Sequence, residues 1–176
     1  MKHPLLPAMK TIATVTAVLA ATTLGAAAPK TLLEHAGARW APARLANAVL
    51  VIVDAQREYA DGKLPLPGVG AAVDEIAVLL GRARAAGTPV IHVVQHGRPG
   101  GAIMDPSGPM AGVLPPLTPR EGETVVVKRL PNSFAGTTLD EELKRLGRKD
   151  LIVVGFMTHM CVSTTVRSAL DHGYRC

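Results

Sequence analysis

Aromatic residues are scarce in this chain of 176 residues, where Phe, Tyr and Trp together make up 3%. Proteins that bind single-stranded nucleic acids stack the bases on such side chains, and too few are present to form that surface. The net charge is +5, but Lys2, Lys10 and Lys30 contribute to it from a first segment without acidic residues, and no basic stripe follows. We therefore expect no nucleic-acid partner.

Cysteine is also rare, with only Cys161 and Cys176 in the whole chain. Two cysteines cannot build a disulfide framework, and no Cys-x-x-Cys pair is present for zinc binding or redox chemistry. Because Cys176 is the last residue, we do not expect a structural disulfide bond from it. Cys161 is then a free thiol whose presence needs an explanation.

The apolar run at residues 11–25 is shorter than the roughly 20 residues that a membrane-spanning helix needs, so no membrane partner is expected. Lys2 and Lys10 precede this run, and residues 26–28 are alanines. A basic start, a short apolar run and small residues are typical of a secretory signal peptide. Residues 1–30 are therefore either a signal peptide, which predicts a periplasmic or secreted protein, or a disordered N-terminal extension of a cytoplasmic one.

The composition of the whole chain, with 48% hydrophobic and 19% charged residues, is that of one folded domain. Solid runs of Val and Ile predict strands that are buried on both faces, and between them apolar residues recur at helical spacing. Strands alternating with helices indicate an α/β fold with a parallel sheet covered by helices on both faces. The predicted strands are 49–54, 89–94, 124–128 and 150–156, the helices are 69–86, 137–147 and 161–171, and 97–122 is a long loop.

Ligand sites in such sheets form at the carboxyl ends of the strands, where Asp54, Gln95, His96, Lys128 and the stretch 156–161 lie. Taken singly, Asp54 could cap a helix or form a buried ion pair, Lys128 could be a surface lysine, and Cys161 could be a small core residue. Together they place an acid or base, a cation and a nucleophile on one rim. We expect Cys161 to open the last helix, whose dipole, together with a nearby lysine, would favour the thiolate.

Three segments resemble the signature segments of the isochorismatase-like cysteine hydrolases, a family that includes nicotinamidases, other small-amide hydrolases and isochorismatases. They are VIVDAQREY, VVVKRLPNSFAGTTL and VVGFMTHMCVSTTVRSALDHGYR, and the resemblance covers residues 40–176. It implies a Rossmann-like parallel sheet in a three-layer α/β/α arrangement and a catalytic triad of Asp54, Lys128 and Cys161. It also implies a cis peptide bond before Met157, so that the N–H groups of Met157 and Cys161 form an oxyanion hole.

The resemblance further implies hydrolysis of a small amide or related C–N bond through a Cys161 thioester, with Asp54 as the proton carrier and Lys128 stabilising the charges. The expected partner is a small-molecule substrate. The side chains that we expect to contact it are Gln56, Tyr59, His96, Asn132 and Phe134.

Two features of the sequence narrow this function. Nicotinamidases of the family carry a metal-binding Asp-x-His-x-x-His after the second strand, whereas His92 and His96 lie here on or just past a strand with no carboxylate beside them. We therefore predict no metal site, and since no strand leads directly into Gly68 and Gly70, no nucleotide cofactor either. Isochorismatases that cleave a vinyl ether often lack the cysteine, so Cys161 favours C–N chemistry and leaves isochorismate hydrolysis as an alternative.

Members of the family usually continue past the position of Cys176 with further strands. We therefore expect a domain that lacks its C-terminal strands, with an exposed sheet edge beside the strand at 150–156. An inactive fragment or a non-catalytic binding module of the same fold is a second interpretation. The family commonly forms oligomers, so a homo-oligomer is compatible with the resemblance.

We predict that the chain as given is less stable, and associates more readily, than a version extended by a family-like tail of about forty residues, the length of a strand and a further αβ unit. The helix that positions Cys161 would gain packing from such a tail. Paired thermal melts and size-exclusion runs on the two chains test this. Equal melting temperatures and equal monomer fractions would show that the tail is not needed.

Overall fold

The computed structural model describes residues 29–37 and 41–176. The predicted signal peptide or extension falls almost entirely outside these residues. The chain divides into two compact units, Met1–Ala41 and Pro42–Cys176. In the first, the short helix α2 (Leu32–His35) is capped by Thr31, whose hydroxyl accepts from Glu34 N–H while the Glu34 carboxylate accepts from Thr31 N–H. None of the helices in the described residues is long and apolar enough to cross a bilayer.

The second unit is built on a four-stranded, all-parallel sheet, which confirms the predicted fold class. Its strands lie in the order β3-β2-β1-β4. They are β1 (Ala48–Val53), β2 (Val90–Gln95), β3 (Thr124–Lys128) and β4 (Asp150–Gly155), within a residue of the predicted bounds at each end. The central strand β1 pairs on both sides and is buried along its whole length, as its β-branched sequence predicts.

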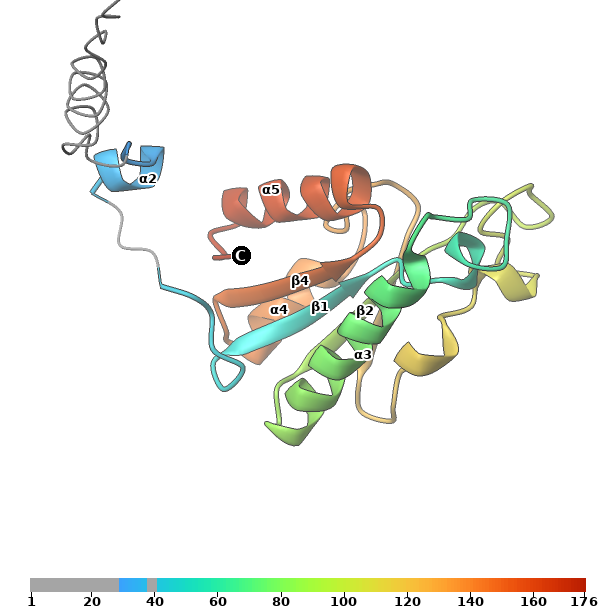
Figure 1. The fold of residues 1–176 in the computed structure, drawn as a ribbon, viewed down its shortest axis with the longest axis horizontal. Coiled ribbons are helices and arrows are strands. Elements are labelled where there is room, and N and C mark those ends of the chain that lie inside the picture. The colour runs from blue at the N-terminus through green and yellow to red at the C-terminus, as the bar shows by residue number, and fades with distance from the viewer. Residues whose placement is uncertain (1–28, 38–40) are drawn as a thin grey trace, which may run out of the picture. The chain divides into compact units, whose positions relative to one another are not determined.

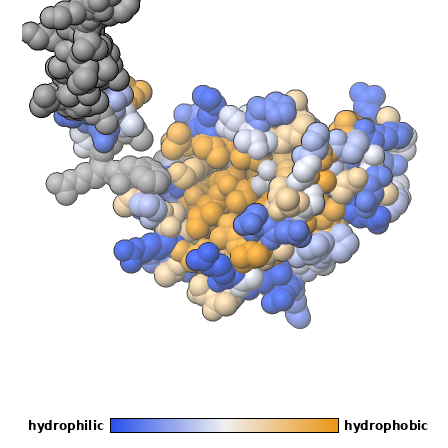
Figure 2. Space-filling view, viewed as in Figure 1, coloured by the Kyte–Doolittle hydropathy of each residue, from blue (hydrophilic) through white to orange (hydrophobic). Residues whose placement is uncertain are grey.

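Helices cover both faces of this sheet, giving the three-layer arrangement seen in Figure 1. Alternate residues of β1 point to opposite faces. Leu50 and Ile52 pack against the buried side of α3 (Val69–Ala85). Val49, Val51 and Val53 pack in a second cluster with residues of α4 (Leu139–Leu146) and α5 (Ser163–Asp171). Figure 2 shows apolar residues gathered beside α3, over β1 and β4.

The sequence predicts strands that are buried on both faces, but the two outer strands are partly exposed. Val125 and Val127 of β3 are 48% and 44% exposed, because β3 lies at an edge of the sheet. The prediction was wrong for this strand, whose Val run resembles that of a central strand. At the opposite edge, β4 has β1 on one side and, on the other, a single parallel bridge between Asp150 and Arg175. Within the described residues, β4 is therefore the second outer strand of the sheet.

The predicted loop after β2 is packed against the domain and contains two short 3₁₀ turns, η2 (Pro109–Ala111) and η3 (Pro115–Leu117). Glu58, in the turn η1 (Arg57–Tyr59), holds it in place. One Glu58 carboxylate oxygen accepts from Met104 N–H at 2.9 Å, and the other accepts from Lys63 N–H at 2.7 Å. A buried carboxylate thus ties the segment after β1 to the segment after β2.

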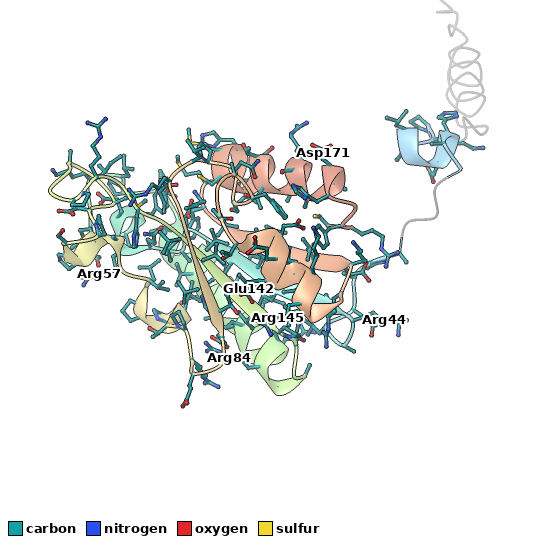
Figure 3. All side chains as sticks on the ribbon, turned by 180° about the vertical axis from the view of Figure 1, so that it is seen from behind. Arg44, Arg57, Arg84, Glu142, Arg145 and Asp171 are labelled. Atoms are coloured by element: carbon teal, nitrogen blue, oxygen red, sulfur yellow. The ribbon has the colours of Figure 1, made fainter. Side chains whose placement is uncertain are left out.

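A largely buried ion pair joins α3 to the start of β3. Arg84 donates from Nε and Nη2 to the two carboxylate oxygens of Glu123, each at 2.8 Å, and its position is labelled in Figure 3. His92 Nε2 lies 3.0 Å from Glu123 Oε2. The Arg84 hydrogen bond is the main reason why the pKa of Glu123 falls from 4.5 to about 2.

We predict that Glu123→Gln lowers the free energy of unfolding by roughly 2 kcal/mol at pH 7. Because folding lowers the pKa of Glu123, its stabilisation is present above about pH 4.5 and is lost as the pH falls toward 2. Urea denaturation at several pH values measures this difference. A variant as stable as the wild type at pH 7, or a difference that does not shrink between pH 5 and pH 3, would contradict it.

Candidate active site

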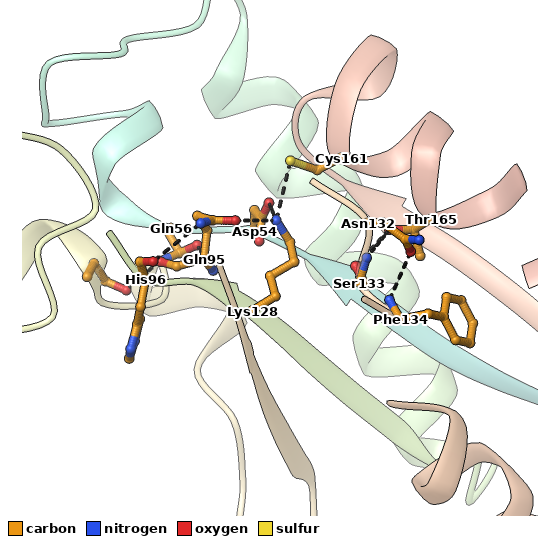
Figure 4. A network of polar contacts seen from close by, with 11 residues as sticks. Asp54, Gln56, Gln95, His96, Lys128, Asn132, Ser133, Phe134, Cys161 and Thr165 are labelled. Carbon is orange, nitrogen blue, oxygen red and sulfur yellow. Dashed lines mark hydrogen bonds and ion pairs between the residues drawn. The ribbon is translucent and has the colours of Figure 1, made fainter. Parts of the chain in front are cut away.

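Three buried side chains meet at the carboxyl edge of the sheet (Figure 4). Asp54 directly follows β1, Lys128 is the last residue of β3, and Cys161 lies in the turn η4 (Thr158–Val162) after β4. Lys128 Nζ is 2.7 Å from Asp54 Oδ2 and 3.4 Å from Cys161 Sγ. The contact expected among these three residues is therefore present.

The Lys128 ammonium is fully buried and is surrounded by three acceptors, as many as it has N–H groups. Asp54 Oδ2 and Gln95 Oε1 each lie 2.7 Å from Nζ, and the Cys161 sulfur is the third. The Asp54 oxygens are buried, and the Lys128 ammonium, 2.7 Å from Oδ2, supplies the charge that compensates them. The sequence predicts Gln95 at the carboxyl ends of the strands but not among the catalytic or substrate-contacting residues.

Asp54 reaches this position through an unusual backbone conformation. Its φ is 50°, in the left-handed region that Asp tolerates better than most residues do. Its N–H still donates to Val93 O at 2.8 Å, so the strand ladder continues up to Asp54 and the chain turns there. Burial raises the pKa of the Asp54 carboxyl, while the charge and hydrogen bond of Lys128 act in the opposite direction. A carboxylate with a raised pKa is a stronger base than one in water.

The thiol of Cys161 differs from the prediction. Cys161 lies in the π-helical turn η4, which runs directly into α5 at Ser163, so the helical segment begins near the predicted position. Burial, followed by the charge and hydrogen bond of Asp54, raises the pKa of the Cys161 thiol, and Lys128 only partly opposes this. The expected low-pKa thiolate was wrong, since burial and the neighbouring carboxylate outweigh the cation. At rest the group is a thiol that needs a base.

The backbone before Cys161 follows β1 closely. The peptide bond between Phe156 and Met157 is cis, as expected. Gly155 has a φ of 125°, and a Cβ there would clash with Val53 O, so only glycine fits. Phe156 N–H donates to Val53 O at 2.8 Å, and Met157 O accepts from the N–H groups of Met160 and Val162. These bonds fix the turn that carries Cys161 to the end of β1.

This chain is similar to known proteins over most of its length. The model of the isochorismatase domain matches residues 48–176. The secreted isochorismatase effector of Verticillium dahliae is 46% identical over 129 residues, which are 73% of this chain and 67% of that protein. Maleamate amidohydrolase of Pseudomonas putida is 30% identical over 142 residues, or 72% of this chain and 67% of that one. The crystal structure of an isochorismatase from Pseudomonas putida KT2440 superposes with a TM-score of 0.80 at 51% identity, over 84% of this chain and 76% of that one.

The protein belongs to the isochorismatase family of hydrolases. The resemblance of the three sequence segments is thereby confirmed.

Gln56 is fully buried and its amide bonds to backbone groups of the protein. Nε2 donates to Gln95 O at 2.9 Å and to Ala111 O at 2.7 Å, and Oε1 accepts from Gln95 N–H at 2.8 Å. Both N–H donors of this amide are used inside the domain, and its contact with substrate stays a prediction.

Asn132 and Phe134 also have partners inside the domain, and their contact with substrate stays a prediction. Asn132 accepts from Phe134 N–H at 2.9 Å and donates to Ser168 Oγ at 3.2 Å, which fixes the turn after β3. The Phe134 ring stacks on His172, with ring centroids 4.7 Å apart, and on Tyr174 at 6.1 Å. It points away from Cys161 in Figure 4 and belongs to the core beneath α5. The sequence offered no sign of these aromatic partners, which lie about forty positions further along the chain.

Tyr59 and His96 remain predicted substrate contacts. The Tyr59 ring packs edge-on against Phe156, with centroids 5.9 Å apart. Burial and then the charges of Asp54 and Cys161 raise the pKa of its phenol well above the usual value. His96 donates its backbone N–H to Lys128 O at 2.9 Å, and its ring is directed away from Cys161 in Figure 4.

No group of three His, Cys, Asp or Glu side chains in the described part of the chain could hold a metal ion. A cavity of about 210 Å³ opens beside Glu58, on the side of the packed loop. Its lining includes Lys63, Ile103, Asp105 and Met110 but none of the three buried residues. The cavity is therefore separate from the chemistry that Asp54, Lys128 and Cys161 could support.

We predict that Asp54→Asn makes the Cys161 thiol more acidic. The Asp54 charge raises the pKa of this thiol, so its removal lets Lys128 stabilise the thiolate unopposed. The rate of alkylation by iodoacetamide should reach half of its plateau at a lower pH than in the wild type. Mass spectrometry of the peptide that contains Cys161 separates its reaction from that of Cys176. A midpoint that is unchanged or higher in the folded variant would contradict the prediction.

Proposed function

We propose that the protein is a cysteine-dependent hydrolase of a small amide or related C–N bond, with Asp54, Lys128 and Cys161 as its catalytic triad. The observation that carries this proposal is the buried contact of a thiol, an ammonium and a carboxylate, with Lys128 Nζ 3.4 Å from Cys161 Sγ and 2.7 Å from Asp54 Oδ2. The family membership and the similarity to an amidohydrolase support it.

In the first half of the reaction, Asp54 accepts the thiol proton as the Cys161 sulfur attacks the carbonyl carbon of the substrate. Lys128 stays close to both negative charges and stabilises the thiolate as it forms. The carbonyl oxygen takes up the displaced electron pair and is held by the N–H groups of Met157 and Cys161, which we assign as the oxyanion hole. The C–N bond then breaks, Asp54 protonates the departing amine, and a thioester remains on Cys161.

In the second half, a water molecule attacks the thioester carbon while Asp54 accepts one of its protons. The C–S bond breaks, the carboxylic acid leaves, and Asp54 returns the proton to the thiolate. Each half moves one proton through the same carboxylate, for which the raised pKa of Asp54 is suited.

Hydrolysis of a vinyl ether is a second candidate, because two of the most similar proteins are named as isochorismatases. Such a reaction needs a proton donor but no thiol. Asp54, whose pKa is raised, could supply that proton without Cys161. The two candidates therefore differ in their dependence on the cysteine.

We predict that Cys161→Ala abolishes hydrolysis of small amides, with a loss on the order of 10⁴-fold in kcat/KM. A panel of primary amides, N-carbamoyl compounds and isochorismate would be assayed on the wild type, Cys161→Ala and Asp54→Asn. Cys176→Ser is the matched control, since it removes the other thiol and should keep full activity. A covalent adduct of Cys161, trapped by acid quench and seen by mass spectrometry, would support the thioester.

Three outcomes would contradict the proposal. Amide hydrolysis that survives in Cys161→Ala would exclude the thioester route. Turnover of isochorismate alone, lost in Asp54→Asn but kept in Cys161→Ala, would establish the vinyl ether reaction instead. Tight binding of a ligand without any turnover would make the domain a binding module.

A further inference from the structure

Gln95 occupies a position between the strands that carry Asp54 and Lys128. It is the last residue of β2, which separates β1 from β3 in the sheet. Gln95 lies in register with Lys128, and its Oε1 accepts from Lys128 Nζ at 2.7 Å. This contact is as short as the ion pair between Lys128 and Asp54. The amide orientation follows from chemistry, because an ammonium group can only donate hydrogen bonds.

Gln95 is itself held at several points. Its Nε2 donates to His96 O at 3.3 Å. The buried Gln56 amide binds both backbone groups of Gln95, accepting from its N–H at 2.8 Å and donating to its carbonyl oxygen at 2.9 Å. The second N–H of the Gln56 side-chain amide donates to Ala111 O. Figure 4 shows the resulting chain of contacts from Gln56 through Gln95 to Lys128.

The choice of an amide at this position has an electrostatic consequence. With Gln95 neutral, the charges of Asp54 and Lys128 balance, and transfer of the thiol proton to Asp54 moves negative charge within the cluster without adding any. A second carboxylate in place of the amide would leave the buried cluster with a net negative charge and oppose the thiolate. An apolar side chain would leave one N–H of the ammonium without an acceptor in a buried site.

We propose that Gln95, held by Gln56, is a positioning residue that keeps the Lys128 ammonium between Asp54 and Cys161 and sets the reactivity of the thiol. The consequence for hydrolysis rests on the proposed function, but the effect on the thiol does not. Gln95 acts through Lys128 and needs no contact with substrate.

The test measures the pH dependence of Cys161 alkylation by iodoacetamide in a Cys176→Ser background. Gln95→Glu keeps the size of the side chain and adds a negative charge, so its midpoint should rise by about one pH unit or more. Gln95→Met removes the acceptor without adding charge and should raise the midpoint by a smaller amount. Arg129→Gln is the matched control, because it makes the same change in net charge at an exposed neighbouring position. Solvent screens that charge, so its midpoint should stay within about 0.2 pH units of the wild type.

Circular dichroism and thermal melts identify which variants are folded, and either Gln95 variant suffices if the other does not fold. A midpoint in a folded Gln95 variant that is unchanged or lower overturns the proposal, as does a shift in Arg129→Gln equal to that in Gln95→Glu. A melting temperature that falls while the midpoint stays constant would show a structural role only. Since alkylation needs no substrate, a wild type without hydrolytic activity would count against the proposed function and leave this result standing.

Discussion

The buried ion pair between Asp54 and Lys128 is the interaction around which the site is organised. Both side chains are fully buried, and loss of either one would leave an uncompensated charge, which typically costs about 3–5 kcal/mol. The two residues come from strands that are not neighbours, because β2 lies between β1 and β3. The ammonium must therefore reach across the end of β2, and the amide of Gln95 provides an acceptor there.

The thiol depends on the same pair. Gly155 allows the chain after β4 to pass against β1, and the turn η4 then brings Cys161 to the ammonium. Burial and the carboxylate together raise the pKa of the thiol. At rest the proton is therefore on the sulfur of Cys161, and the negative charge is on Asp54. Within this arrangement, proton transfer from Cys161 to Asp54 requires little movement of charge and no exchange with bulk water. Such a transfer is the step that a cysteine hydrolase needs before it attacks a carbonyl.

The segments after β1 and β2 are fixed by polar side chains that take no part in this cluster. Glu58 joins these two segments through backbone N–H groups, and Gln56 joins Ala111 of the second segment to the end of β2. Buried polar groups of this kind are stable only when each has its partners. Here these hydrogen bonds hold the segments after β1 and β2 against each other beside the carboxyl edge of the sheet.

The sequence by itself determined the order of strands and helices and the three residues at the carboxyl edge, because Val and Ile runs and helical spacing are local patterns and the signature segments are contiguous. It did not reveal that β3 is an edge strand, since Val125 and Val127 look the same in either position. Only the tertiary structure decided the partners of Gln56 and Phe134 and the contact between Gln95 and Lys128. In the structure the pKa of Cys161 is raised, whereas the sequence predicted that it would be lowered. The physical reason is that hydrogen-bond partners and pKa values depend on groups distant in the chain, such as Gln56 and Ala111, 55 positions apart, which only folding brings together.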